Sequence, residues 1–308
     1  MNNKMLDLLK EYNINYVLNQ STDIKFHGFG IGDLLFSIIS LENNIINIPI
    51  NISVNFFLNQ YYNDNDNDKK IEWNENLEES LKFRLKFITD ICRNSENIKI
   101  SDFCFILNEN NKVYGNQFDY NIDYRLIKDY RMKLNDDFFN DINDNDGDFI
   151  VFHSKVRLTT QYDYKNIKEK IKMLCSSLKI KKSKKIYLLG EKKFKKNYEG
   201  SIHNIQTIYD ELLELKNNNE VIDLTIEEIY NSLNYENYKR DISIIKKAKW
   251  NIIIGHGGHL CSSLIFGNVI FFDPMDEKYF FNNMNLYNSG HRYFKRFEKF
   301  CEYLQIEL

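Results

Sequence analysis

The sequence predicts an α/β protein of two domains, each built on a parallel sheet with helices on both faces. Three observations favour this fold class. The 308 residues suffice for two domains, and 43% hydrophobic residues can fill two cores. Strand-like and helix-like segments alternate along the second half. A run rich in asparagine and aspartate, residues 134–148, separates the halves. We therefore expect domains at 1–140 and 148–290 and a C-terminal amphipathic helix at 291–308.

The first half carries the weaker pattern. Residues 26–40 read as a glycine-rich turn that leads into an apolar helix. Residues 45–58 alternate polar and apolar side chains, as a strand with one buried face does. Further elements are expected as a helix at 77–93 and strands at 16–18 or 24–26 and at 103–107.

The second half alternates clearly, and this predicts a doubly wound parallel sheet. Strands are expected at 148–153, 185–189, 221–224, 250–255 and 269–272, and helices at 165–178, 205–216, 226–233, 238–248 and 260–266. Ligands of such sheets bind at the carboxyl ends of the strands. The residues expected there are His153, Gly190, Asp223 and His256.

The first candidate site is the turn that contains Gly30, Gly32 and Asp33. Alternate glycines let the backbone approach a ligand, and an acid at a helix start can act in a binding cleft. The turn is not a dinucleotide fingerprint, because Asp33 stands where the third glycine is due. The structural alternative makes Asp33 a helix cap that stabilises by about 1 kcal/mol.

The second candidate is the glycine-rich turn after the apolar strand 250–255. Its residues are Gly255, His256, Gly257, Gly258 and His259. A turn that feeds directly into a helix offers amide groups to a phosphate, and either histidine could donate a hydrogen bond to it. The alternative is a tight crossover with a buried His259.

The third candidate is the basic turn after the strand 148–153, which carries Lys155 and Arg157. Cations there could neutralise a leaving diphosphate, and arginine binds phosphate in bidentate fashion. Basic residues are also ordinary in the loops of a lysine-rich chain, so both interpretations stay open.

Other patterns argue against further ligand classes. The formal charge of −3 gives no global attraction to nucleic acid, and the five cysteines have no CxxC spacing. The Asp-Asn-Asp runs at 64–66 and 144–146 resemble a metal motif but lie in low-complexity segments. No metal site and no cofactor are expected. The N-terminus lacks a signal peptide and no apolar run could span a bilayer, so we expect a cytoplasmic protein, with peripheral membrane contact left open.

With these residues in view, the sequence resembles the heptosyltransferase family and, more broadly, glycosyltransferases of the GT-B fold. Gly30, Gly32 and Asp33 look like the family's N-terminal turn, whose aspartate is the proposed general base. Residues 247–260 and 271–274 are similar to its donor-binding stretch, with His256, Gly257 and Gly258 in place of the usual Asp-[Ser/Thr]-Gly. Residues 153–157 more weakly resemble the His-x-Arg-Arg turn of fucosyltransferases.

The resemblance implies two facing Rossmann-like domains and a metal-independent glycosyltransferase. Asp33 would deprotonate an acceptor hydroxyl in the interdomain cleft, and the second domain would bind a nucleotide-diphosphate sugar. The acceptor would be a glycan, a lipid or a protein. Two alternatives remain: a sugar-nucleotide epimerase or hydrolase on the same fold, and a degenerate protein that binds sugar nucleotides or glycans without turnover. The sugar, the nucleotide and the oligomeric state stay open.

Overall fold

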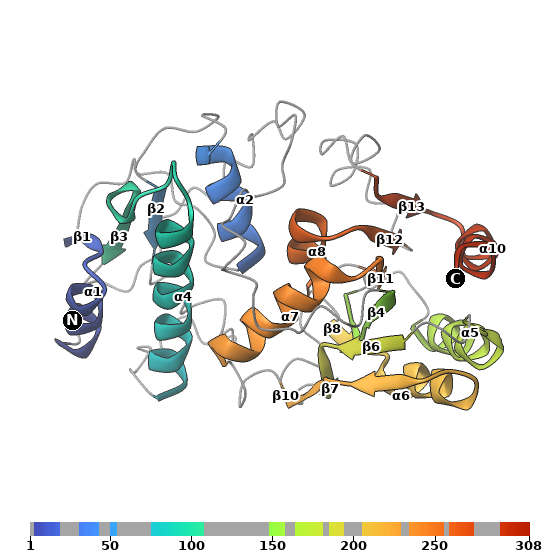
Figure 1. The fold of residues 1–308 in the computed structure, drawn as a ribbon. Coiled ribbons are helices and arrows are strands. Elements are labelled where there is room, and N and C mark those ends of the chain that lie inside the picture. Colours follow the sequence, from blue (N-terminus) through green and yellow to red (C-terminus); the bar gives the residue numbers. More distant parts are fainter. Residues whose placement is uncertain are drawn as a thin grey trace. The chain divides into compact units, whose positions relative to one another are not determined.

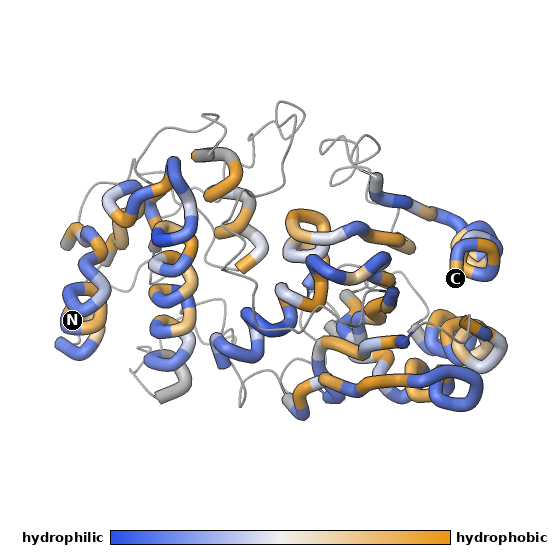
Figure 2. Tube along the Cα trace, viewed as in Figure 1, coloured by the Kyte–Doolittle hydropathy of each residue, from blue (hydrophilic) through white to orange (hydrophobic). Residues whose placement is uncertain are grey.

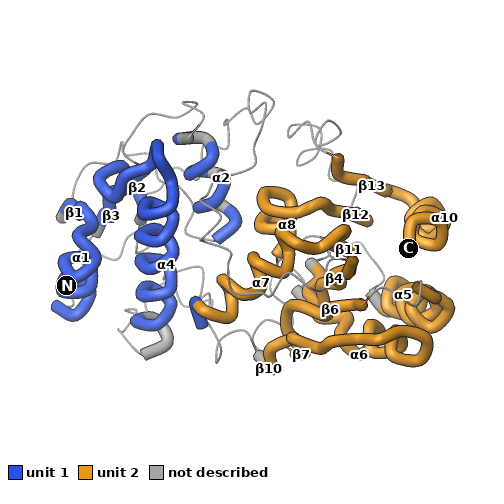
Figure 3. Tube along the Cα trace, viewed as in Figure 1, with its two compact units in different colours: residues 1–138, 233–235 blue, residues 139–232, 236–308 orange. Residues whose placement is uncertain are grey.

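The computed structural model divides the chain into two compact units (Figure 3). Unit 1 is Met1–Phe138 with Leu233–Tyr235, and unit 2 is Phe139–Ser232 with Glu236–Leu308. The structure describes residues 3–18, 31–42, 50–53, 75–107, 148–157, 164–180, 185–193, 205–228, 234–255, 259–273 and 290–308. None of the helices in these ranges is long and apolar enough to cross a membrane.

Unit 1 is built on a small parallel sheet with three strands in the order β1-β3-β2. Its elements are α1 (Asn3–Glu11), β1 (Asn15–Leu18), α2 (Ile31–Glu42), β2 (Ile50–Ser53), α4 (Glu75–Asn94), the 3-10 helix η1 (Ile100–Asp102) and β3 (Phe103–Leu107). Hydrophobic and hydrophilic residues alternate along α4, as expected of a helix with one buried face (Figure 2). The buried face of α4 includes Leu81, Leu85, Ile88 and Ile91.

Unit 2 contains a parallel sheet of six strands in the order β13-β12-β11-β4-β6-β9 (Figure 1). The strands are β4 (Phe149–His153), β6 (Lys185–Leu189), β9 (Val221–Asp223), β11 (Trp250–Ile254), β12 (Val269–Phe272) and β13 (Arg292–Phe294). Numbered by their appearance along the chain, they lie in the order 3-2-1-4-5-6. This is the order of doubly wound dinucleotide-binding sheets, and it confirms the α/β class and the parallel sheet predicted for the second half.

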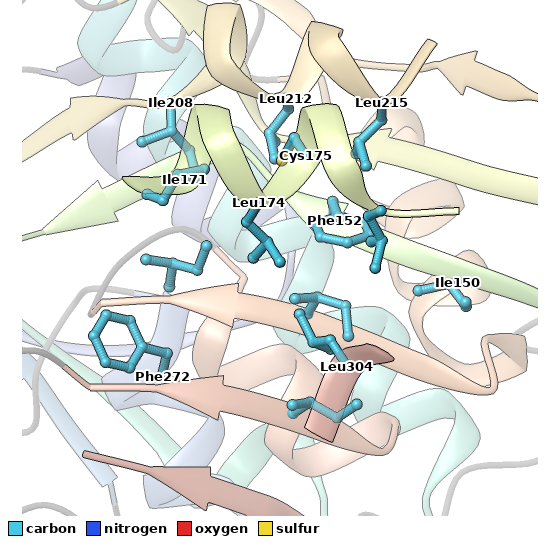
Figure 4. Close-up of a cluster of buried hydrophobic side chains, with 14 of the residues drawn as sticks. Ile150, Phe152, Ile171, Leu174, Cys175, Ile208, Leu212, Leu215, Phe272 and Leu304 are labelled. Carbon is cyan, nitrogen blue, oxygen red and sulfur yellow. The ribbon is translucent and has the colours of Figure 1, made fainter. Parts of the chain in front are cut away.

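Helices cover both faces of this sheet (Figure 1). They are α5 (Tyr164–Ser177), α6 (Tyr209–Leu212) with the 3-10 helix η6 (Leu213–Asn217), α7 (Tyr235–Lys247, its first residue grouped with unit 1), α8 (Leu260–Phe266) and α10 (Phe297–Glu307). Side chains of α5 such as Leu174 and Cys175 pack with Leu212 and Phe152 in one buried cluster (Figure 4). Helices α7 and α8 lie on the other face, where Asn251 of β11 donates a hydrogen bond to the carbonyl of α7 residue 245.

Short strands extend the chain beyond the carboxyl ends of the sheet strands. β5 (Lys155–Arg157) pairs antiparallel with β8 (Ile205–Thr207), and β7 (Glu191–Lys193) pairs parallel with β10 (Ile226–Glu228).

Two helix predictions need correction. The helix predicted at 205–216 is confirmed only from Tyr209, because residues 205–207 form strand β8, and residues 226–228 of the helix predicted at 226–233 form strand β10. In both cases the apolar spacing suits a helix locally, but a strand partner distant in sequence determines the conformation. The C-terminal helix likewise begins at Phe297, because residues 292–294 pair with β12.

Candidate functional site

The centre of the unit 2 sheet contains the point where the strand order reverses. From β4 the chain proceeds through α5 to its neighbour β6, whereas from β11 it proceeds through α8 to β12 on the opposite side. β4 and β11 are hydrogen-bonded neighbours, with Ile252 opposite Phe152. The two connections leave the sheet in opposite directions, so a crevice for ligands is expected at the carboxyl ends of these two strands.

His153 is the last residue of β4 and lies at this reversal point. Its side chain is buried. Its Nε2 atom is 3.4 Å from Oδ1 of Asn251 on β11 and 3.4 Å from Oγ of Ser263 on α8. Residues from three elements therefore hold the ring in place.

The amide of Asn251 determines which nitrogen of His153 carries the proton. Asn251 Nδ2 lies 3.0 Å from the carbonyl oxygen of Ile245 and 3.2 Å from that of Asn268. Because carbonyl oxygens only accept, this end of the amide must be the NH₂ group, and the oxygen must face His153. Nε2 of His153 therefore bears the hydrogen and donates it. Nδ1 of the neutral ring is then an acceptor, and it is buried without a partner among the described residues.

Gly267 makes this placement of the amide possible. A Cβ atom at Gly267 would lie 2.5 Å from Asn251 Nδ2 and 2.6 Å from the carbonyl oxygen of Ile245. No side chain fits there without displacing the amide.

The environment of His153 disfavours its charged form. Burial, together with the nearby His259, lowers the pKa of His153 to about 3 and outweighs the hydrogen bond with Asn251, which acts in the opposite direction. The ring is therefore neutral at physiological pH. A group with this pKa is a poor general base, but it is a good fixed acceptor of a hydrogen bond.

His259 precedes α8 and lies beside His153, with 5.6 Å between the ring centroids. Its Nε2 atom is 3.2 Å from Oδ2 of Asp241 on α7, and Arg240 contacts the other oxygen of that carboxylate at 2.7 Å. The ring also stacks on Tyr238, with centroids 5.9 Å apart. Since a carboxylate only accepts, the Nε2 atom of His259 that faces Asp241 is the nitrogen that carries a hydrogen.

The glycine-rich turn itself is described in part. Gly255 has a φ of 67°, in the left-handed region that glycine adopts without strain, and its amide donates to the Phe272 carbonyl at 2.8 Å. His256, Gly257 and Gly258 lie outside the described residues. Helix α8 has only seven residues, so its dipole offers less than the sequence pattern suggested.

The basic turn after β4 directs its lysine to a partner within the protein. Lys155 Nζ lies 3.6 Å from Oε1 of Glu191, and both side chains are largely buried. Ser154, between β4 and β5, donates through Oγ to the Glu191 carbonyl at 2.8 Å, which joins this turn to β7. The charge of Lys155 is therefore already balanced. The backbone of Arg157 lies in β5, but its side chain is outside the described residues.

Asp223 ends β9 and is also engaged. It accepts from Tyr209 Oη at 2.6 Å and from the amide and hydroxyl of Thr225. Burial raises the pKa of Asp223, but the hydrogen bonds from Thr225 and Tyr209 outweigh burial and hold that pKa below its usual value.

The N-terminal candidate falls at the edge of what the structure describes. Helix α2 begins at Ile31, which places Gly32 and Asp33 in its first turn as the sequence indicated. Gly30 and the side chain of Asp33 lie outside the described residues. Their roles therefore stay predictions.

Asn251 and Asp241 were missed as site residues from the sequence, and His153 was noted for its position at a strand end and for the weak resemblance to the fucosyltransferase turn. A signal existed for two of them, because Asn251 is a polar residue inside the apolar strand WNIII and His153 ends the apolar strand FIVFH. Nothing in the sequence of α7 distinguishes Asp241 from its polar neighbours.

In the part of the chain that the structure describes, no group of three or more His, Cys, Asp or Glu side chains is arranged to hold a metal ion. Comparisons of the chain with known protein families, curated proteins and solved structures give no match.

Proposed function

We propose that unit 2 binds a nucleoside diphosphate group at the reversal point between β4 and β11, as the donor site of a glycosyltransferase of the GT-B type. The observation that best supports this proposal is the placement of His153 and His259 at the carboxyl ends of these two strands, with ring centroids 5.6 Å apart. Sheets of this strand order bind nucleotides at that position.

The two histidines have complementary chemistry. His259 contacts the carboxylate of Asp241 through Nε2, and its Nδ1 donates a hydrogen bond to a phosphate oxygen of the bound ligand. A donor held in place in this way can stabilise the negative charge that develops on a leaving diphosphate. Burial keeps His153 neutral, so its ring brings no positive charge to the site.

In the proposed reaction an acceptor hydroxyl attacks the anomeric carbon of the bound sugar nucleotide. The bond between that carbon and the diphosphate oxygen breaks, and the nucleoside diphosphate leaves with the bonding electrons. Asp33 takes the proton of the attacking hydroxyl. The role of Asp33 is supported by its place in the first turn of α2 and by the sequence resemblance.

Calorimetry with ADP, GDP, UDP and CDP in the presence of a chelator tests the donor site. We expect one of them to bind, and we expect His259→Ala to weaken that binding about 10- to 100-fold, the effect of losing a hydrogen bond to a charged group. His291→Ala is the matched control, because His291 is buried in the same unit and its two ring nitrogens contact backbone groups, the amide of Val269 and the carbonyl of Leu264. Absence of binding for the whole panel, or an absolute requirement for magnesium, would contradict the proposal.

Asp33→Asn tests transfer separately from binding. Asparagine keeps the capping oxygen but cannot accept the proton, so turnover should fall by about 10²–10⁴ with unchanged donor affinity. A variant that binds donor and transfers sugar at the wild-type rate would exclude Asp33 as the base. Hydrolysis or epimerisation of the donor without any acceptor would favour the alternative enzyme classes.

A further inference from the structure

Among the residues that the structure describes, the buried acceptor of His153 is distinct from the other buried polar atoms that lack a hydrogen-bond partner. These atoms are Thr89 Oγ1, Glu191 Oε2 and Glu211 Oε2. Each carboxylate has a lysine near its other oxygen, Lys155 at 3.6 Å and Lys168 at 3.5 Å respectively. The hydroxyl of Thr89 lies in helix α4 and can rotate towards the backbone of the preceding turn.

His153 has no comparable freedom. The contacts of Nε2 with Asn251 and Ser263 fix the plane of the ring, so Nδ1 cannot turn towards another donor. An unpaired buried acceptor destabilises a protein, and such atoms in native structures call for a specific explanation. This one lies where sheets of this order bind their ligand.

We propose that Nδ1 of His153 accepts a hydrogen bond from a hydroxyl group of the bound sugar nucleotide, so that His153 selects ligands by a hydroxyl and not by a phosphate. This inference rests on the proposed function. A phosphate oxygen is itself only an acceptor at neutral pH and offers nothing to an acceptor nitrogen. A hydroxyl offers a proton and fills the unpaired position. Both the ribose and the transferred sugar carry such hydroxyls.

The two histidines then contact different parts of the ligand. His259, backed by Asp241, contacts the diphosphate, whereas His153, held by Asn251, contacts a hydroxyl of an attached sugar ring. Selection by a buried polar group is strong, because an analogue without the hydroxyl leaves the acceptor unpaired in the complex.

Two substitutions of His153 test the contributions of its two ring nitrogens one at a time. The amide of glutamine reaches the position of Nε2, so His153→Gln keeps a donor towards Asn251 and loses the acceptor at Nδ1. The amide of asparagine reaches the position of Nδ1, so His153→Asn keeps an acceptor there and loses the donor towards Asn251.

The experiment measures melting temperature and affinity for the nucleoside diphosphate that binds the wild-type protein, for its 2′-deoxy and 3′-deoxy forms, and for its glucose and mannose derivatives. If the hydroxyl is on the ribose, one deoxy form binds the wild-type protein about tenfold more weakly. If it is on the transferred sugar, a sugar derivative binds more tightly than the bare diphosphate by a similar factor.

In either case we expect His153→Gln to keep its melting temperature and lose the preference, and His153→Asn to melt earlier and keep the preference. A wild-type protein that binds the diphosphate but shows neither preference would overturn this inference alone. So would a preference that survives in His153→Gln. Failure of the wild-type protein to bind any member of the panel would overturn the proposed function and this inference together.

Discussion

The two sides of the unit 2 sheet use their polar side chains differently. On the side of β6 and β9, charged groups at the strand ends are paired within the protein: Lys155 with Glu191, and Asp223 with Tyr209 and Thr225. At the junction of β4 and β11, the contacts hold His153 rigidly but leave its Nδ1 unpaired among the described residues. Internal pairing fits a structural role, whereas a rigid and unsatisfied group fits a binding role.

The largest effect on stability is expected at the junction. Asn251→Ala removes a buried amide that satisfies two backbone carbonyls and the Nε2 hydrogen of His153. We expect the free energy of unfolding to fall by about 3–5 kcal/mol, from unpaired polar groups together with the cavity. Denaturant unfolding measures this.

Asn219→Ala is the matched control for that change. Asn219 also makes hydrogen bonds to three backbone groups, those of Ile180, Leu178 and Leu215, but its side chain is only partly buried. Because water can replace the lost partners, we expect a loss of about 1 kcal/mol. Equal losses for both variants would show that the junction is not specially dependent on its buried amide.

A smaller effect is expected on the β6 side. Lys155→Met leaves the carboxylate of Glu191 without its cation in a buried place, so unfolding free energy should fall by about 1–3 kcal/mol. The double variant with Glu191→Gln should recover part of this loss. If Lys155 is structural, nucleotide affinity stays unchanged in calorimetry. The hypothesis that Lys155 binds the donor phosphate predicts a clear loss of affinity instead. That result would assign a binding role to the β6 side of the sheet as well.

The smallest effect concerns pH. His153 has a pKa of about 3 in the folded protein, against the ordinary value of 6.5 that applies to the unfolded chain. The unfolded chain therefore binds more protons than the folded protein between these two pH values. Stability therefore rises with pH across this window and falls on acidification, by about 0.7 kcal/mol from pH 7 to pH 6. Melting curves should show a weaker pH dependence for His153→Gln. An identical dependence in both proteins would mean that His153 is charged in the fold or not buried.

The central sheet was predictable from the sequence because its strands are short apolar runs separated by helical patterns. Residues 250–254 and 269–272 are almost wholly apolar, and buried parallel strands have this composition. Strands β8 and β10 were not predictable in the same way, because partners far along the chain determine their conformation.

The candidate site also has a part that local sequence signals predict and a part that depends on contacts between distant residues. His259 could be selected as a candidate from the glycine-rich turn before it, since that signal is local. The contact of Asp241 with His259 depends on how α7 packs beside the start of α8, and the free acceptor of His153 depends on a hydrogen bond between residues 98 positions apart. Contacts between residues so far apart along the chain cannot be predicted from a single sequence.

Hydrogen exchange with and without a saturating nucleoside diphosphate tests whether the ligand binds at the junction of β4 and β11, because it reports both sides of the sheet in one experiment. We expect the ligand to slow amide exchange in residues 149–154, 250–255 and 259–263, at this junction. We expect little change in residues 205–228, on the side where the charges are already paired. Protection confined to residues 205–228, with no change at the junction, would contradict the proposed binding site.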